Sequence, residues 1–444
     1  MRSLLPLLLF SFSLHAQKLP DPELTAADRR KIAEAFAKRV ESSYVLAEPA
    51  KQIAKAIREH VRGGAYDDIA TASAFAERLT SDARAVQNDR HLRVAVAGSV
   101  VPADHDAERP PTPEQKAEAR ENLRKINFGV AEAKRLDGNV GYLDLEVFPP
   151  LELAKDALDA AVASLADTDA LIIDARRHRG GDPATVAHLV SWFVPEGTLI
   201  NETYTRENGD VTKYHAGKLS GARYGKKVWV LTSKRTFSGG EELAYDFQAL
   251  KRGTIVGEVT GGGAHPTRPF RIHERFLAMI PFRQSINPVT KTNWEGVGVK
   301  PDVAVAADEA LQVAHAAALK ALDRTPSAAA TAAAKTEVEN SAARTLLAGW
   351  VKSFNEDDVA ARRAWLRANS TLPDAQVEQY ATMDTEIRDG HGAFDIVRFG
   401  EVSATSAEAF AKHRKSGMGG RIRIEVDAKD PKKIAKIGLQ PADA

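Results

Sequence analysis

Apolar residues recur every three to four positions in the first part of the chain. Between residues 21 and 87 this spacing, seen at Ile32, Phe36 and Val40, predicts three short helices that form a small bundle. Residues 92–96 then predict a strand. A connector rich in proline and charged residues follows, and the pattern changes near residue 128.

In the middle of the chain, strand-like runs alternate with helical periodicity. The turn Asp137-Gly138-Asn139 predicts a β-hairpin. Residues 170–174 are continuously apolar up to their final aspartate, as in a strand that is buried on both faces of a sheet. The alternation predicts an α/β layer architecture. Further elements are expected at 151–165, 184–193 and 240–251 (helices), at 227–232 and 254–257 (strands), and at about 268–282 (a last hairpin).

An alanine-rich, low-complexity segment precedes the last part of the chain. Beyond it, residues 338–368 predict two helices and the remainder a few strands, including residues 421–426, which together indicate a small α+β unit. The order of these elements is loosely similar to cystatin-like or nuclear-transport-factor-like folds. The predicted organisation is a signal peptide (1–16), an N-terminal helical domain (17–110), a core (111–325), a linker (326–335) and a C-terminal α+β domain (336–444).

Composition and charge narrow the classes of function. A chain of 444 residues is long enough for more than one hydrophobic core. Its net charge of +1 gives no support for a nucleic-acid partner, which a basic stripe would indicate. The chain has no cysteine, which excludes disulfides, thiolate metal ligands and a cysteine nucleophile.

The first residues have the layout of a secretory signal peptide. Met1-Arg2 supplies positive charge, residues 4–14 are largely apolar, and Leu14-His15-Ala16 resembles a cleavage site. The apolar run is too short to span a membrane. We therefore expect an exported protein, periplasmic or extracellular, with no membrane span in the mature chain.

A serine between an apolar strand and a helix is the first candidate for chemistry. Ser238 is followed by Gly239 and Gly240, and the N-terminus of a helix favours developing negative charge. Ser238 also fits an ordinary N-cap, with Glu241 completing a capping box. The local sequence favours the cap, and the two roles are compatible.

A pair of glycines after the buried strand is the second candidate. Gly180-Gly181 can direct backbone N–H groups toward an oxyanion, or can simply form the turn that starts the next helix. Neither this pair nor the segment of Ser238 decides the chemistry by itself.

Together these segments resemble the C-terminal-processing (tail-specific) serine peptidases. The resemblance rests on residues 171–181, 238–241 and 255–263 and covers roughly residues 87–305. Within that family the chain is most similar to the branch of the interphotoreceptor retinoid-binding protein repeats and the tricorn protease core. The resemblance implies an α/β sandwich core of the ClpP/crotonase-like type, with Ser238 as the nucleophile. It also implies an oxyanion hole formed by Gly239 with Gly180 or Gly181.

The processing peptidases pair their serine with a lysine in a glycine-rich loop, and this chain lacks that lysine. The loop reads Gly261-Gly262-Gly263-Ala264-His265. A serine hydroxyl needs an adjacent base to become a good nucleophile.

The tricorn-like branch instead uses a histidine before the core and a glutamate well after the serine. Residues 88–92 and 293–302 match those two motifs, which implies His91 as general base and Glu295 as the acid that orients it. Arg90 stands where that branch carries a serine, so the pattern departs from the branch at this position. Without the motif match, the sequence would favour a structural role for His91 at a domain junction.

The resemblance implies a peptidase that acts on peptides or unfolded proteins and needs no cofactor. The stretch from residue 92 to residue 128 is too short for a PDZ domain, which needs about 80–100 residues. The alternative is a non-catalytic module that binds hydrophobic ligands, as in the retinoid-binding branch. No metal site is expected: His265, His273 and Glu274 lie close together in the sequence, but no second histidine follows His273 one turn on, as a zinc helix would need. The sequence leaves the oligomeric state open.

Overall fold

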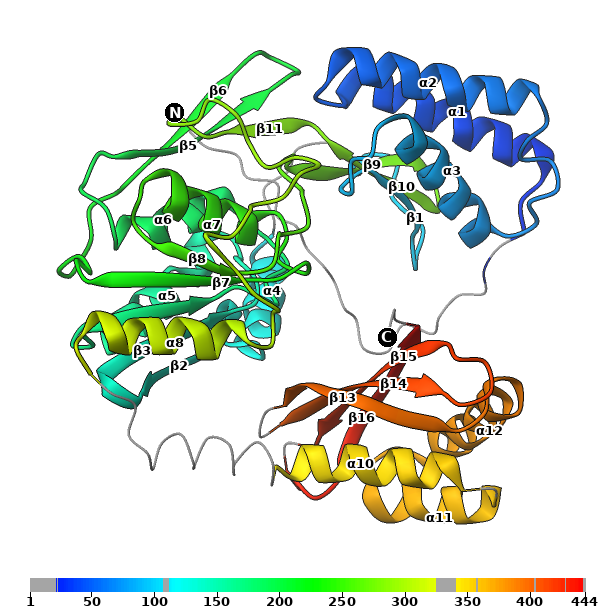
Figure 1. Ribbon diagram of the computed structural model, residues 1–444. Helices are drawn as coiled ribbons and strands as arrows, with labels where there is room; N and C mark the ends of the chain where they lie inside the picture. Colours follow the sequence, from blue (N-terminus) through cyan, green and yellow to red (C-terminus); the bar gives the residue numbers. More distant parts are fainter. Residues whose placement is uncertain are drawn as a thin grey trace. The chain divides into compact units, whose positions relative to one another are not determined.

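The computed structural model describes residue 21 and residues 23–106, 112–324, 341–356, 358–402, 405–427 and 429–441. The predicted signal peptide (1–16) and the predicted linker (326–335) lie outside the described residues. The chain divides into two compact units, Met1–Thr325 and Pro326–Ala444, which we describe separately (Figure 1).

Three helices and a three-stranded sheet form the N-terminal body. Antiparallel strands in the order β1-β10-β9 lie beneath the helices. Phe36 and Phe75 of the helices share one core with Phe270 and Phe276 of the hairpin β9–β10. The predicted helical unit is therefore completed by a hairpin from much later in the chain. The elements are α1 (Ala26–Ser43), α2 (Ala47–Arg62), α3 (Ala72–Val86), β1 (Arg93–Val96), β9 (Thr267–His273) and β10 (Phe276–Pro281).

A six-stranded mixed sheet in the order β12-β8-β7-β4-β3-β2 forms the centre of this unit. Only β2 is antiparallel to its neighbour. The strands are β2 (Val130–Leu136), β3 (Val140–Leu145), β4 (Ala170–Asp174), β7 (Lys227–Thr232), β8 (Thr254–Gly257) and β12 (Val303–Ala304). The helices that cover it are α5 (Leu151–Ser164), α6 (Pro183–Ser191), α7 (Gly239–Ala249) and α8 (Ala310–Ala321).

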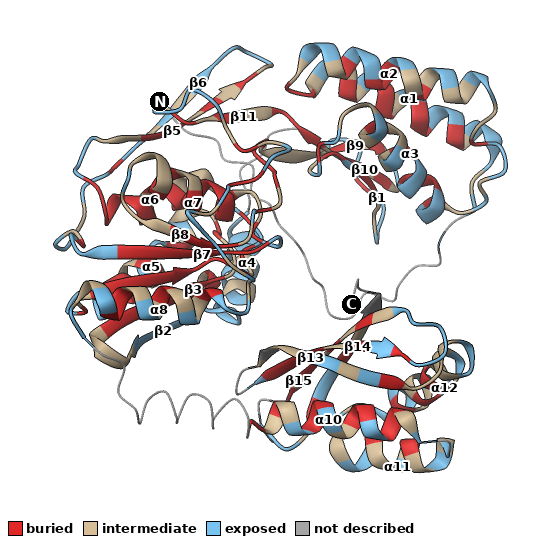
Figure 2. Ribbon diagram, viewed as in Figure 1, coloured by how far each residue is buried: buried red, intermediate tan, exposed pale blue. Residues whose placement is uncertain are grey.

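Strand β4 explains why both faces of this sheet are covered. Leu171 and Ile173 belong to the core shared with α5, α6 and α7, whereas Ala170 and Ile172 belong to the core shared with α8. Successive side chains of a strand point to opposite faces, so an apolar strand needs a layer on each side. The predicted α/β layers are confirmed, and Figure 2 shows the central strands as buried.

Several elements escaped the sequence pattern because they bury little apolar surface. Helix α4 (Pro113–Arg124) has no buried residue, and β6 (Val211–His215) no buried position. Strand β6 lies in a small sheet of order β11-β5-β6, with β5 (Leu199–Thr205) and β11 (Arg283–Ile286). Helix α4 did carry a recognisable start, a Thr112–Gln115 capping box followed by proline.

The C-terminal unit is a small α+β fold. Helices α10 (Ala342–Asn355), α11 (Val359–Asn369) and α12 (Asp374–His391) precede an antiparallel sheet in the order β13-β14-β15-β16. Its strands are β13 (Phe394–Val402), β14 (Ser406–His413), β15 (Gly419–Val426) and β16 (Ile434–Pro441). The sequence predicted two helices here, and α12 was missed because only Val377, Ala381 and Asp384 of it are buried. None of the helices within the described ranges has the length and apolar character that crossing a bilayer requires.

We expect Phe276→Ala to lower the free energy of unfolding of the N-terminal body by about 3–5 kcal/mol, the usual cost of deleting a buried phenylalanine. Phe276 is 0% exposed. Urea unfolding measures the loss, with Val100→Ala as control, since Val100 is 64% exposed. An unchanged unfolding curve for Phe276→Ala would contradict the assignment of the hairpin to this core.

Candidate active site

Ser238 occupies a tight turn between strand β7 and helix α7. Its backbone has φ of 54° and ψ of −119°, a conformation that a residue with a side chain rarely adopts. The residue is half-buried, and its carbonyl oxygen accepts hydrogen bonds from the N–H groups of Glu241 and Glu242. Ser238 takes the predicted N-cap position, and the Glu241 carboxylate accepts the Ser238 N–H as one half of the predicted capping box, but the Ser238 hydroxyl makes no cap hydrogen bond.

Glu241 ties this turn to the glycine-rich loop. Its carboxylate is fully buried and accepts hydrogen bonds from the Ser238 N–H (2.8 Å) and from Thr260 Oγ1 (2.5 Å). It also accepts from the N–H groups of Gly262 (2.6 Å) and Gly263 (2.8 Å). Burial raises the pKa of Glu241, and the four donors oppose that effect by stabilising the charged form.

The Gly180-Gly181 loop lies against the turn of Ser238. Gly180 has φ of +103°, and a methyl group placed on it would lie 3.2 Å from Ser238 Oγ. A methyl group on Gly239 would lie 3.1 Å from the nitrogen of Gly181. Glycine is required at these positions because the two backbones approach so closely.

Two backbone N–H groups on the facing loops are available to a ligand. The Gly180 N–H is occupied, because it donates to Nδ1 of the buried His178 (3.0 Å). The N–H groups of Gly181 and Gly239, by contrast, donate to no acceptor within the described ranges. Of the two glycines that sequence analysis proposed for this loop, Gly181 is therefore the one with a free donor.

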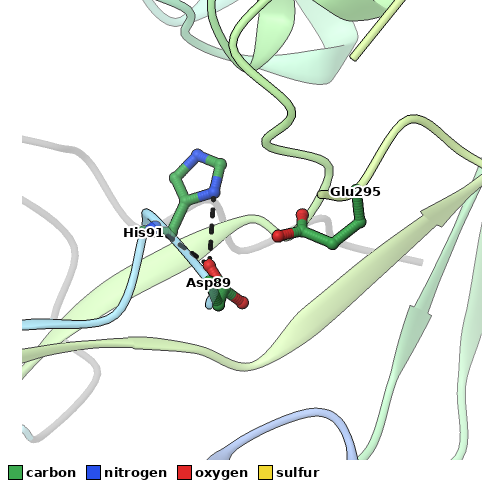
Figure 3. Close-up of side chains that lie close together, drawn as sticks. All are labelled: Asp89, His91 and Glu295. Carbon is green, nitrogen blue, oxygen red and sulfur yellow. Dashed lines mark hydrogen bonds and ion pairs between the residues drawn. The ribbon is translucent and has the colours of Figure 1, made fainter. Parts of the chain in front are cut away.

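His91 reaches the same region from the N-terminal body. Its imidazole packs against the ring of Phe237, the neighbour of Ser238, with 4.6 Å between ring centroids and a tilt of 36° between the ring planes. Its Nδ1 lies 3.8 Å from Asp89 Oδ1, and the other ring nitrogen points away from Asp89 (Figure 3). Burial lowers the pKa of His91 to about 4. The imidazole is therefore neutral at physiological pH.

Glu295 comes from the loop after β11 and points toward the same place. One ligand atom each of Asp89, His91 and Glu295 lies within 4.8 Å of the others (Figure 3). Glu295 Oε2 accepts the N–H of Ala264 at 2.5 Å, while Oε1 has no hydrogen-bond partner among the residues that the structure describes. Burial and then the charge of Asp89 raise the pKa of Glu295 to about 7.

Sequence reasoning missed Asp89 and His265. Asp89 is 0% exposed and accepts from Tyr44 Oη (2.9 Å) and from the His91 N–H (2.9 Å). His265 Nδ1 lies 2.8 Å from Asp89 Oδ2 and 3.5 Å from Glu295 Oε2. Two signals were available: the Asp-x-His spacing of residues 89–91, and a histidine at the end of the loop that lacks the lysine.

The structure thus brings all six predicted site residues into one region, in two groups. Ser238 and the three glycines form one group; His91 and Glu295 form the other, joined to the first through Phe237. No hydrogen bond joins Ser238 to His91 among the described residues, and such bonds often tighten only when substrate binds. Lys234, the nearest lysine in sequence, faces Glu258 at 3.7 Å and its side chain is 82% exposed.

Comparison with known proteins identifies the class. The sequence profile of peptidase family S41 matches residues 139–305, and that of the N-terminal domain of peptidase S41 in eukaryotic IRBP matches residues 25–130. Together the two matches span more than half of the chain. The protein is therefore a serine-type peptidase, and it belongs to peptidase family S41. The predicted family is confirmed, whereas the lack of a PDZ domain stays a prediction.

The chain is also similar to several solved structures. A protein from Parabacteroides merdae described as a peptidase is 20% identical, with a TM-score of 0.48 over 66% of this chain and 96% of its own. The photosystem II D1 C-terminal processing protease is 16% identical, with a TM-score of 0.39 over 63% of this chain and 93% of its own. The tricorn protease is 13% identical, with a TM-score of 0.39 over 67% of this chain and 36% of its own.

Glu241→Ala should lower the free energy of unfolding by about 3 kcal/mol, because each buried donor that loses its acceptor costs about 1–3 kcal/mol. Thermal and urea unfolding measure the loss. Glu196→Ala is the matched control, since the Glu196 side chain is 61% exposed. Equal stability of the two variants would mean that the four hydrogen bonds do not hold the turn.

Proposed function

We propose that this peptidase hydrolyses peptide bonds through an acyl-enzyme, with Ser238 as nucleophile, His91 as general base and then acid, and Glu295 as the acid that orients His91. The observation that carries the proposal is the strained turn of Ser238 at the start of α7. The turn lies against Gly180-Gly181, with the His91 ring packed against the adjacent Phe237.

In the first half of the reaction, Ser238 Oγ attacks the scissile carbonyl carbon while its proton passes to His91 Nε2. The carbonyl oxygen becomes an oxyanion, and the N–H groups of Gly239 and Gly181 donate to it. His91 then gives its proton to the leaving amine as the C–N bond breaks. In the second half, water attacks the ester by the same proton transfers and releases Ser238.

The electrostatics of the histidine support this assignment. A base must be neutral before the reaction, and burial lowers the pKa of His91 to about 4. The imidazolium that forms needs a nearby negative charge, and both Asp89 and Glu295 approach the ring. The site therefore keeps His91 neutral before the reaction. The two carboxylates can still stabilise the imidazolium that forms for a short time during it.

The alternative, a non-catalytic module for hydrophobic ligands, needs an apolar cavity. Two surface hollows in the described part are instead rich in charged side chains, among them Lys226 and Arg252 in one and Glu77 and Arg84 in the other. Neither favours that alternative. Peptides or unfolded proteins are the proposed substrates, and export remains a proposal from residues 1–16.

A fluorophosphonate probe should label the wild-type chain, and Ser238→Ala should abolish the labelling. His91→Ala should lower kcat/KM for a peptide substrate by about 10²–10⁴-fold, the usual contribution of a general base. Ser220→Ala is the control, because Ser220 is an exposed serine of the same unit. Labelling that survives Ser238→Ala would refute this nucleophile.

Activity should rise with pH through a midpoint near 7, because the pKa of Glu295 is raised to about 7 and its charged form stabilises the imidazolium. Glu295→Gln removes that titration, so the residual activity should titrate at lower pH, where His91 gains its proton. Profiles of kcat/KM from about pH 4 to about pH 9 measure the shift. Identical midpoints for the variant and the wild type would exclude Glu295 from the mechanism.

A further inference from the structure

We propose that Asp89, His91 and Glu295 also form an inhibitory binding site for a divalent transition metal, with Zn²⁺ as the preferred ion. One imidazole nitrogen and two carboxylates are a ligand set that zinc takes readily, and a catalytic-type site leaves the fourth position to water. The binding claim stands on the geometry alone. The inhibition claim rests on the proposed role of His91.

Two buried atoms in this cluster lack a partner and belong to residues that face one another. His91 Nδ1 and Glu295 Oε1 are both buried, and neither makes a hydrogen bond within the described part of the chain. Among the described residues, Asp89 Oδ1 accepts a hydrogen bond from the His91 N–H alone (2.9 Å), which leaves it able to bind an ion. A buried polar atom without a partner is costly, and a cation between these residues would satisfy both orphaned atoms.

The three ligand atoms would need to move only slightly closer together to bind an ion with tetrahedral geometry. Zinc bound to nitrogen and oxygen holds its ligand atoms about 3.4 Å apart. His91 Nδ1 and Asp89 Oδ1 are already 3.8 Å apart, and all three ligand atoms lie within 4.8 Å of one another. The side chains of His91 and Glu295 are each 12% exposed, which leaves the ion a path from solvent.

A second layer of hydrogen bonds holds the ligands in place. Tyr44 Oη and His265 Nδ1 both bind Asp89 Oδ2, and the Ala264 N–H binds Glu295 Oε2. These contacts occupy Asp89 Oδ2 and Glu295 Oε2 and leave Asp89 Oδ1 and Glu295 Oε1 to the ion. Support of this kind raises metal affinity, and its loss commonly costs about 10–100-fold.

Metal binding at Nδ1 would stop the proposed reaction by a change of tautomer. A neutral imidazole that coordinates through Nδ1 must carry its proton on Nε2. Nε2 then has no lone pair with which to accept the proton of Ser238. Zinc would thus block the general base without contacting the nucleophile.

Titration calorimetry with ZnCl₂ on full-length Ser238→Ala tests the site without any need for activity. We expect one ion per chain, with binding at least about tenfold weaker after His91→Gln or Glu295→Gln, and about 10–100-fold weaker after His265→Gln. His105→Gln is the matched control, because His105 pairs with Asp106 at 3.1 Å in a similar histidine–aspartate contact. Absence of binding, or binding that resists both ligand variants, would overturn the site.

Peptide hydrolysis by the wild-type chain tests the second half of the proposal. Zinc should inhibit at concentrations that match the calorimetric affinity, and a chelator should restore activity. Stoichiometric binding without inhibition would overturn the regulatory claim and leave the ion site intact. Failure of the fluorophosphonate labelling would instead count against the proposed function, since calorimetry reports on the ion alone.

Discussion

A single buried carboxylate holds together the segments around Ser238. Glu241 sits in the first turn of α7, so its backbone is rigid. Its side chain accepts from Ser238, Thr260, Gly262 and Gly263, which belong to the turn after β7 and to the loop after β8. Burial alone would neutralise a carboxyl group, and four donors favour the charged form that can accept them all. The positive φ of Ser238 is sustained by this arrangement, because a strained backbone persists only where its surroundings determine it.

The second constraint is the hairpin β9–β10, which links the glycine-rich loop to the N-terminal body. Its strand β10 pairs with β1, which begins two residues after His91. Phe270 and Phe276 anchor the hairpin in the core of the three N-terminal helices. The histidine is therefore placed by long-range packing, whereas the serine is placed by its own strand and helix. The position of His91 relative to Ser238 therefore depends on the packing of the N-terminal body.

The residues around His91 come from distant parts of the sequence, so a linear motif does not reveal their contacts. Asp89 and His265 are 176 residues apart in the sequence, yet their side chains are 2.8 Å apart. The motif match predicted that His91 and Glu295 come together. The burial of Asp89, its four polar contacts and the low pKa of His91 depend on the packing of Tyr44 and of the glycine loop. Low-dielectric surroundings arise only when distant segments exclude water together.

The amino-acid sequence alone determined the helices and strands whose apolar periodicity is strong, among them α5, β4 and β7. It also determined the serine–glycine turn and the family, because such signals lie within short stretches of chain. Elements that bury little apolar surface, such as α4 and β6, were missed because they lack a strong apolar periodicity. Only the tertiary structure decided that the hairpin β9–β10 completes the helical body, that Gly181 rather than Gly180 keeps a free N–H, and that Asp89 lies beside His91. Those facts depend on which surfaces meet in space, and the free energy of such contacts comes from residues far apart in the chain.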